Sequence, residues 1–336
     1  MIQSYLLNRK QFTLVNGTTS EERSINIGVP QGSVLGPLLF LLYINDLPLA
    51  SCLHTKLFAD DTCLIFSATT LDELQIIINQ EIKKIDLWMS SNKLSLNYKK
   101  TKYMLIHRKN DRSHLNLYIN NKKIEQTRSI KYLGVKIDEN LNWREHIKYV
   151  ETKISQACGA IYKLRNFVDQ DCLRTLYYGY AYSFIQYACL AWGTASKTAL
   201  RKVQMRHQRL IRAMTLHGPL ENMNFSANEM AKNMNVLKFE DVFTLELAKF
   251  MHRAYYNKLP PTLENFFTKT EMMHRYNLRS RTSHRFYLPH CRTAKYRKSF
   301  KILGIELWNK LANELKSVAF LSPFAKKYKK SLIESY

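Results

Sequence analysis

The 336-residue sequence contains none of the cysteine spacings that mark metal-binding or disulfide-stapled domains. No two of its six cysteines form a C-x-x-C pair, so neither a zinc knuckle nor a disulfide framework is expected. Scattered thiols are typical of the reduced core residues of an intracellular protein. One group of potential metal ligands matches no metal-binding spacing, which favours solvated or phosphate-contacting roles. The group consists of His274, His284, His290 and Cys291.

The sequence also lacks an apolar signal core and a clear membrane span. Arg9 and Lys10 place positive charge near the N-terminus. The apolar run 34–44 contains Pro37 and is too short to cross a bilayer. Residues 175–196 carry no charge over 22 positions, but the segment is rich in tyrosine and interrupted by glycine and glutamine. We therefore expect a buried helix of a soluble domain there, and no membrane partner.

Acidic residues are scarce relative to basic ones. Lys and Arg number 51 against 27 Asp and Glu, which gives a formal net charge of +24 at pH 7. Such an excess attracts polyanions, above all the phosphate backbone of nucleic acids. We favour nucleic-acid binding over a merely solubilising surface. Ribosomal or chromatin-type binding explains the charge equally well, so the charge alone does not indicate an enzyme.

Hydrophobic patterns predict short strands and helices in the first part of the chain. Residues 1–27 should form a helix end and a strand pair that turns at Asn16-Gly17. A buried helix capped by Ser33 is predicted at 34–45. The clearest helix begins with the capping box at 70–73 and keeps apolar residues at helical spacing. Further strands are predicted at 102–107, 115–119 and 130–137. From about residue 143 the pattern becomes helical, with a second basic helix at 199–216.

The most informative segment is Phe58-Ala59-Asp60-Asp61-Thr62, in which two adjacent aspartates lie between short apolar runs. Such runs predict a β-hairpin with both carboxylates at its turn, where they can serve one site. Paired carboxylates suit Mg²⁺, which prefers hard oxygen ligands and bridges to phosphates. Two such metals stabilise the attacking and leaving oxygens of a phosphoryl displacement. Taken alone, the pair is more often an ordinary surface turn, because Asp favours turns.

Further motifs occur in a fixed order around this pair. They are Gly28-Val29-Pro30-Gln31-Gly32-Ser33, which continues to Phe40; Tyr43-Ile44-Asn45-Asp46-Leu47-Pro48; Lys93-Leu94-Ser95-Leu96-Asn97; Lys100-Thr101-Lys102; and Tyr132-Leu133-Gly134-Val135. In this order they resemble the reverse transcriptases of non-LTR retrotransposons, especially the jockey-like group. The resemblance covers about residues 1–150 and extends more loosely to the C-terminus. Group II intron and telomerase-type polymerases are weaker relatives.

The resemblance implies an α+β fold that contains part of a polymerase right hand. A partial reverse transcriptase palm, a mixed sheet with helices, is expected at 1–149. A helical thumb-like region that grips the template–primer duplex is expected at 150–217. A linker at 218–230 and a basic helical or irregular C-terminal region at 231–336 would follow.

The resemblance also implies roles for single residues. Asp60 corresponds to the main metal-binding aspartate and Asp61 assists it, with Mg²⁺ as the expected cofactor of a two-metal site. Lys100 lies where such polymerases place a proton donor for pyrophosphate, although Lys99 and Lys102 compete for that role. The expected template- and dNTP-binding residues are Gly28, Gln31, Gly32 and Ser33. The expected primer-grip turn is Tyr132, Leu133 and Gly134, which an ordinary strand end would also explain.

Two basic surfaces are predicted to bind nucleic acid. The helix at 199–216 provides Arg201, Lys202, Arg206, Arg209 and Arg212. Residues 272–305 hold nine Lys or Arg, no Asp or Glu, and interleaved aromatic residues that can stack on unpaired bases. The candidate cations there are Arg279, Arg281, Arg285, Arg297 and Lys298. A solvated loop with core aromatics is the simpler alternative for this tail.

The reaction implied is RNA-templated attack of a primer 3′-hydroxyl on the α-phosphorus of a dNTP, in the nucleus or cytoplasm. RNA template, DNA primer and dNTP are therefore the expected partners. The family has another metal-binding aspartate upstream, yet no Asp precedes Asp46 here; Glu21 and Glu22 lie in a variable connection. We therefore expect a truncated reverse transcriptase that is inactive alone. The alternatives are a non-catalytic nucleic-acid-binding remnant and an incomplete palm that does not fold stably.

Overall fold

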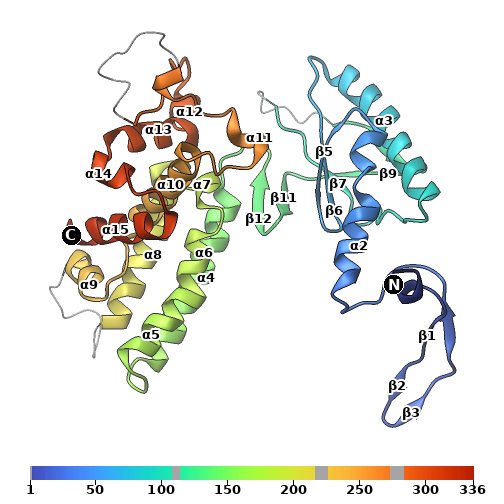
Figure 1. Ribbon diagram of the computed structural model, residues 1–336, viewed down its shortest axis with the longest axis horizontal. Coiled ribbons are helices and arrows are strands. Elements are labelled where there is room, and N and C mark those ends of the chain that lie inside the picture. The colour runs from blue at the N-terminus through green and yellow to red at the C-terminus, as the bar shows by residue number, and fades with distance from the viewer. Residues whose placement is uncertain (1, 108–113, 216–225, 273–283) are drawn as a thin grey trace. The chain divides into compact units, whose positions relative to one another are not determined.

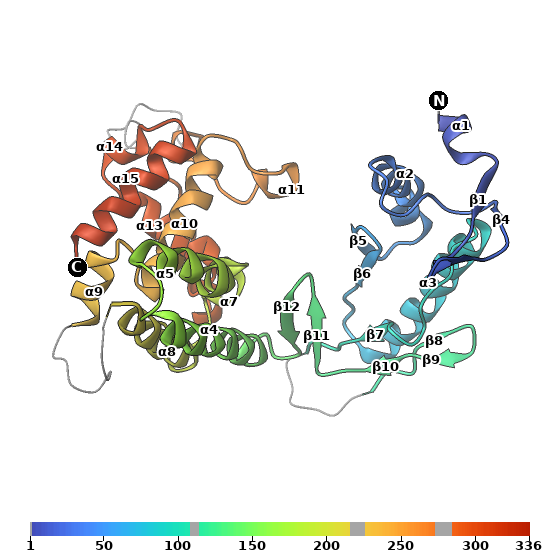
Figure 2. The same ribbon diagram turned by 90° about the horizontal axis from the view of Figure 1, so that it is seen from below.

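The computed structural model describes residues 2–107, 114–215, 226–272 and 284–336. The chain divides into two compact units, Met1–Thr127 and Arg128–Tyr336. Figures 1 and 2 show the elements of each unit from two directions. Strands and helices mix in the first unit, whereas the second unit is mostly helical.

The first unit combines helices with two-stranded sheets. Its helical elements are α1 (Ile2–Leu6), α2 (Leu35–Ile44), the 3₁₀ turn η1 (Leu47–Ala50) and α3 (Leu71–Ser91). Its antiparallel pairs are β1 (Arg9–Gln11) with β4 (Arg23–Ile25), β2 (Leu14–Val15) with β3 (Thr18–Thr19), β5 (His54–Phe58) with β6 (Asp61–Ile65), and β8 (Tyr118–Ile119) with β9 (Lys122–Lys123). A parallel pair joins β7 (Lys102–Tyr103) to β10 (Glu125–Gln126). This mixture confirms the α+β class. The described strands pair two by two, so the mixed sheet of a palm remains a prediction.

Helix α3 follows the signals in its sequence. The Thr70 side chain accepts a hydrogen bond from the Glu73 backbone N–H at 3.3 Å, which satisfies an end group of the helix. The Glu73 carboxylate accepts from the backbone N–H of Thr69. One face of the helix packs into two small cores, through Ile85 and Met89 on one side and Ile82 on the other. Helix α3 therefore anchors the first unit.

Helix α2 is more exposed than predicted. Ser33 does cap it, because its Oγ accepts from the Gly36 backbone N–H at 3.1 Å and donates to the Pro30 carbonyl at 2.7 Å. However, Leu38 and Leu42 are 54% and 66% exposed. The prediction of a buried helix is therefore wrong for this unit. The helix is apolar on every side, and the small neighbouring core covers one side of it.

The second unit starts with an antiparallel hairpin of β11 (Ser129–Tyr132) and β12 (Val135–Asp138). Its first helices are α4 (Arg144–Leu164), α5 (Gln170–Tyr177), the π-helix η2 (Tyr178–Tyr182), α6 (Ser183–Gln186), α7 (Cys189–Trp192) and α8 (Lys197–Thr215). Then follow α9 (Ala227–Asn233), α10 (Phe239–Tyr255), α11 (Pro261–Glu264), the 3₁₀ turn η3 (Thr270–Met272), α12 (Ala294–Arg297), α13 (Phe300–Lys310), α14 (Asn313–Lys316) and α15 (Leu321–Glu334). The predicted linker at 218–230 lies partly outside the described residues, and its described end from Ser226 forms the capping box of α9.

Two segments of the second unit differ from their predictions. The strand predicted at 130–137 is a hairpin, because Leu133 and Gly134 both have positive φ and reverse the chain. The helix predicted at 175–196 is interrupted, since Ala188, at φ 50°, separates α6 from α7. Its buried face nevertheless continues through the breaks, at Tyr177, Ala181, Ile185, Cys189 and Trp192. In the described part of the chain, no helix is both long and apolar enough to span a bilayer.

A single large core holds the second unit together. Helix α4 packs along α8, and α10 contacts α8, α13 and α15 (Figure 2). Trp308 of α13 is fully buried and donates its indole N–H to the His284 carbonyl at 2.9 Å. Asn309 both donates to and accepts from the Phe286 backbone, which fixes the segment after residue 283 against α13. Phe286 is thus a core residue, and we exclude it from the aromatics that could stack on bases.

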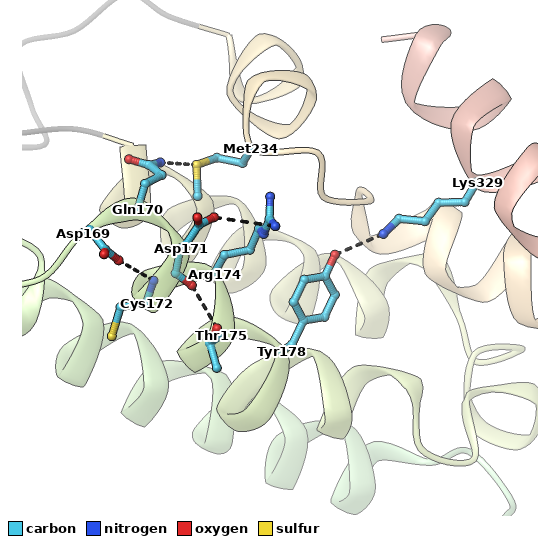
Figure 3. A network of polar contacts seen from close by, with 9 residues as sticks. All are labelled: Asp169, Gln170, Asp171, Cys172, Arg174, Thr175, Tyr178, Met234 and Lys329. Atoms are coloured by element: carbon cyan, nitrogen blue, oxygen red, sulfur yellow. Dashed lines mark hydrogen bonds and ion pairs between the residues drawn. The ribbon is translucent and has the colours of Figure 1, made fainter.

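Polar contacts attach helix α5 to its surroundings (Figure 3). Asp169 accepts from the Cys172 backbone N–H at 2.7 Å and caps the helix. Gln170 contacts the sulfur of Met234, near the end of α9. Lys329 of α15 donates to the Tyr178 hydroxyl at 3.1 Å. The last two contacts link α5 and the adjoining η2 to segments that lie more than 50 residues later in the sequence.

Three buried histidines make the second unit sensitive to acid. Burial lowers the pKa of His207 from 6.5 to about 4, and burial, with Lys136 nearby, lowers the pKa of His146 to about 4. Burial also lowers the pKa of His252. The unfolded chain therefore binds more protons than the folded chain between about pH 6.5 and 4, so stability falls as the pH falls through this range.

We expect acid to weaken the wild type more than a His207→Gln variant. The depressed pKa of His207 alone corresponds to roughly 3 kcal/mol of lost stability at pH 4. Urea unfolding followed by tryptophan fluorescence at pH 7, 5.5 and 4.5 measures the difference between the two proteins. The variant should be less stable at pH 7, because the contact with the Tyr177 hydroxyl changes, yet its stability should depend less on pH. Parallel pH curves would contradict this assignment.

Candidate metal and nucleic-acid sites

The hairpin β5–β6 presents both aspartates at its tip. Phe58 pairs with Asp61, which leaves Ala59 and Asp60 as a two-residue loop. Ala59 has φ 50°, and a positive φ at the first loop residue is the mark of type II′ hairpin turns. Asp60 therefore lies in the loop and Asp61 at the start of β6, so both carboxylates are at the same end of the hairpin. The predicted hairpin is confirmed.

Both carboxylates are free to bind a cation. Asp60 and Asp61 are exposed, and among the described residues neither side chain forms a hydrogen bond or an ion pair. Their oxygens have the donor chemistry that Mg²⁺ prefers, so the pair fits part of a magnesium coordination shell. In the described residues, no group of three or more His, Cys, Asp or Glu side chains comes together. The remaining ligands of a metal held here would have to come from water, substrate phosphates or other carboxylates.

The loop at 28–33 owes its shape to glycine. Gly28 and Gly32 both have φ 79°, a conformation that side chains with a Cβ rarely adopt. Arg9 donates to the Gly28 carbonyl at 2.6 Å and so ties the loop to β1. Gln31 is exposed, whereas Ser33 is used in capping α2. Contact of these four residues with template or dNTP remains a prediction.

The structure separates the three lysines considered for proton donation. Lys102 pairs with Glu125 at 3.0 Å, and Lys99 lines a surface pocket. Lys100 is exposed, and in the described part of the chain its side chain forms no ion pair. Lys99 and Lys100 are thus both available to a phosphate, and the role of Lys100 remains a prediction.

The proposed primer-grip turn is a tight hairpin held from outside. Tyr132 pairs with Val135, and Leu133 and Gly134 form the loop with φ 46° and 80°, as in a type I′ turn. The Tyr187 hydroxyl donates to the Leu133 carbonyl at 2.6 Å. A Cβ added to Gly134 would lie 3.2 Å from the Tyr187 ring, so the two groups are closely packed. Tyr187 therefore fixes the tip of this hairpin.

Sequence reasoning missed Tyr187 because it treated residues 175–196 as one helix. Tyr187 has an extended backbone and Ala188 a left-handed one, which turns the tyrosine out of the helical path. Its carbonyl accepts from the buried indole of Trp192 at 2.9 Å, which holds the break in place. An uncharged segment with several aromatics was the available signal, but it does not reveal where a helix breaks.

Asp138 was also missed, and it joins the same hairpin to helix α4. Its buried carboxylate accepts three backbone N–H groups, from Asn140 and Asn142 at 3.1 Å and from Trp143 at 2.7 Å. Trp143, with φ 64°, begins α4 in a left-handed conformation that this carboxylate supports. Hydrogen bonds to a charged group are stronger than neutral ones, so Asp138 determines the angle at which α4 leaves the hairpin.

The basic residues of α8 lie on one exposed face. The opposite face of the helix is apolar and buried, and includes Val203, Leu210 and Met214. Arg206 pairs with Glu151 of α4 at 3.2 Å, which leaves the other four cations without an acidic partner among the described residues. The exposed cations of this face are Arg201, Lys202, Arg206, Arg209 and Arg212. The helix thus presents the positive face that the sequence predicted.

The C-terminal basic set is described in part. Arg279 and Arg281 lie outside the described residues. Arg285, Arg297 and Lys298 are exposed, the last two around the end of the short helix α12. Their contact with nucleic acid remains a prediction.

Comparison with known proteins shows what the first part of the chain is similar to. Residues 1–137 match the family model of the reverse transcriptase (RNA-dependent DNA polymerase). The resemblance inferred from the sequence motifs is thereby confirmed for the part that contains the aspartate hairpin. No solved structure matches the chain.

Similar curated proteins are polymerases of transposable elements. The chain is 27% identical over 223 residues to the probable RNA-directed DNA polymerase from transposon X-element of Drosophila melanogaster, covering 64% of this chain and 24% of the relative. It is 25% identical over 227 residues to the RNA-directed DNA polymerase from mobile element jockey of Drosophila funebris, covering 64% and 25%. The chain thus spans about a quarter of the length of these relatives. Its similarity to the polymerases of jockey-like non-LTR elements is confirmed.

We expect a Tyr187→Phe variant to loosen the β11–β12 tip without unfolding the unit. The variant keeps the ring and removes one hydrogen bond, which contributes about 0.5–1.5 kcal/mol. Amide hydrogen exchange of residues 130–137 should accelerate by roughly three- to tenfold, while exchange in α10 stays unchanged. A Tyr180→Phe variant serves as control, because Tyr180 is 64% exposed. Equal exchange rates at the tip in all three proteins would show that Tyr187 does not hold it.

Proposed function

We propose that this chain is a part of an RNA-directed DNA polymerase of a non-LTR retrotransposon that supplies the aspartate hairpin and surfaces for template and primer. The observation that carries the proposal is the pair of exposed, unpartnered carboxylates at the tip of β5–β6, in the segment that matches the reverse transcriptase family. The palm and thumb assignments, at 1–149 and 150–217, belong to this proposal. So do the RNA template, DNA primer and dNTP.

In this function each candidate residue has a separate task. Magnesium, when bound, would neutralise charge on the reacting phosphates. Asp60 and Asp61 would hold it with hard oxygen donors. The glycines of the 28–33 loop would let the backbone lie close to template and dNTP, and the β11–β12 tip would position the primer end. Helix α8 would neutralise backbone phosphates of the duplex.

We further propose that the polypeptide as it stands binds nucleic acid without extending a primer. A two-metal site needs more ligands than the two carboxylates of the hairpin, and the described residues bring no third group to them. A non-catalytic nucleic-acid-binding remnant is the second candidate function. The exposed cations of α8 favour it, because they need no metal to act.

A primer-extension assay with Mg²⁺ or Mn²⁺ on a poly(rA)–oligo(dT) template tests the catalytic part. We expect no extension by the purified chain, but salt-sensitive binding of the template–primer by both the chain and an Asp60→Ala, Asp61→Ala variant. Extension that disappears in the variant would refute the proposed inactivity and establish the aspartates as metal ligands. A chain that binds no template–primer at low salt would refute the proposed function itself.

If α8 binds the duplex, removing positive charge from α8 should make the binding constant less dependent on salt concentration. A Lys202→Ala, Arg209→Ala variant should lower the slope of log K against log salt by about one to two for a duplex, because each cation releases about one counterion. Fluorescence anisotropy with a labelled template–primer duplex measures the slope. The control is Lys326→Ala, Lys327→Ala, which removes two exposed charges from α15. If variant and control give the same slope, α8 is not the binding face.

A further inference from the structure

A surface pocket of the first unit has no role in the function proposed above. It has a volume of about 740 Å³ and lies between the turn at 95–101 and the strands β9 and β10. Its lining includes Asn97, Tyr98, Lys99, Lys122 and Lys123. Asn97 belongs to a motif noted in the sequence and Lys99 was one of three lysines considered for proton donation, but Tyr98, Lys122 and Lys123 were given no role. Its volume lies in the range of about 300–1,000 Å³ that is typical of ligand sites.

One wall of the pocket is a turn built around Asn97. The Asn97 carbonyl accepts from the Lys100 and Thr101 backbone N–H groups, both at 3.0 Å, and from the Thr101 hydroxyl at 3.0 Å. The Asn97 side chain also accepts from the Lys100 N–H at 3.2 Å. A turn with its backbone groups satisfied in this way keeps its shape without a ligand. Tyr98 and Lys99 thus occupy fixed backbone positions.

The opposite wall is the β8–β9 hairpin. Asn120 and Asn121 have φ 48° and 60°, as in a type I′ turn, and the strand after them begins with Lys122 and Lys123. The flanking Ile119 and Ile124 are buried against α3 residues, which anchors the hairpin.

Two contacts connect the walls through Tyr98. The Asn120 side-chain amide donates to the Tyr98 hydroxyl at 2.9 Å. The Lys122 ammonium lies 4.9 Å from the centroid of the Tyr98 ring, a cation–π distance. The Lys122 ammonium is therefore held over the Tyr98 ring at the pocket, and neither contact cancels the positive charge.

The charge of the pocket is not balanced by acids. Its one carboxylate, Glu125, already pairs with Lys102 at 3.0 Å. Among the described residues, Lys99, Lys122 and Lys123 form no ion pair. Three free ammonium groups in a concave surface create a local positive potential that concentrates anions. The ligand should therefore carry several negative charges.

We propose that this pocket binds a single-stranded nucleic-acid segment, with the three lysines on its phosphates and Tyr98 against a base or sugar. Sites that bind single-stranded nucleic acid commonly combine cations along the phosphate backbone with aromatic rings that stack on bases. A single strand exposes its bases to an aromatic ring at the protein surface, whereas a duplex keeps its bases stacked and offers only phosphates. Serine, asparagine and threonine at the rim provide further hydrogen-bonding groups.

The test uses the full chain and a fluorescein-labelled oligodeoxythymidylate of about 12 nucleotides, a length within single-strand site sizes. A Lys122→Ala, Lys123→Ala variant should lower the slope of log K against log salt by about 1.4, because each single-strand phosphate contact contributes about 0.7. A Tyr98→Ala variant should bind roughly fivefold or more weakly through loss of stacking. The control Lys326→Ala, Lys327→Ala also removes two adjacent exposed lysines.

Amide hydrogen exchange locates the bound strand independently of the variants. Residues 95–101 and 118–126 should become protected when the oligonucleotide is added to the wild type, and this protection should be absent in the Lys122→Ala, Lys123→Ala variant. Equal urea midpoints show that the Lys122→Ala, Lys123→Ala variant folds, which is expected because both lysines are exposed. Tyr98 packs against the neighbouring core, so the Tyr98→Ala variant should have a lower midpoint and the lysine variant carries the test.

Three results would overturn the proposal. One is an unchanged salt slope in the pocket variant. A second is the absence of protection at the pocket in the presence of bound oligonucleotide. A third is displacement of the oligonucleotide by inorganic phosphate or poly-glutamate at equal charge concentration, which would indicate a general anion site. If the Lys122→Ala, Lys123→Ala variant binds normally while the Lys202→Ala, Arg209→Ala variant does not, the pocket is not a binding site but the proposed function is unaffected. If the wild type binds no nucleic acid, the proposed function fails as well.

Discussion

The tight two-residue turn is the constraint on which the candidate sites depend. Such a turn needs a positive φ in its loop, and the chain meets that need at Ala59, at Asn120-Asn121 and at Leu133-Gly134. The first turn presents two carboxylates, the second presents two lysines, and the third forms the proposed primer-grip tip. A longer loop would let these groups move apart. The short loop keeps the functional group next to a hydrogen-bonded strand end, so its position follows from the strand pairing.

Positive charge is the second constraint, and tyrosine helps the chain to tolerate it. A carboxylate beside a lysine orders the side chain but cancels the charge that a phosphate would meet. A tyrosine ring also orders the lysine side chain but leaves its charge intact. The cation–π interaction stabilises an exposed pair by about 0.5–1 kcal/mol. Lys122 lies over Tyr98, Lys329 over Tyr178 and Lys238 over Tyr336. With 20 tyrosines and 27 acids against 51 basic residues, the composition suits this solution.

Features that depend on residues close together in sequence could be predicted, whereas features that depend on distant contacts could not. The β5–β6 hairpin and helix α3 were predicted correctly, because alternation around Asp60-Asp61 and the cap at Thr70 lie within a few residues of the structure that they specify. The residue pattern at 130–137 predicted one strand, and only the family resemblance indicated a turn at 132–134, because leucine rarely adopts the positive φ found at Leu133. The break at Ala188 depends on the buried Trp192 and on the distant Leu133 carbonyl, which no local pattern reveals. Contacts across many residues therefore limited the prediction of the site.

The two units differ in the size of the hydrophobic cores that support their candidate sites. In the second unit one continuous core supports α8 and the β11–β12 tip, and buried groups such as Asp138 and Trp192 fix the connections. The first unit divides its apolar residues between two small clusters, and α2 keeps Leu38 and Leu42 in solvent. Stability increases with the apolar area that a core removes from water. The surfaces proposed to bind a duplex therefore lie on the unit with the larger core, whereas the aspartate hairpin lies on the unit with the smaller cores. Binding of nucleic acid through α8 does not require the order at the hairpin tip that metal-dependent chemistry requires, and this difference makes binding the more robust of the two proposed properties.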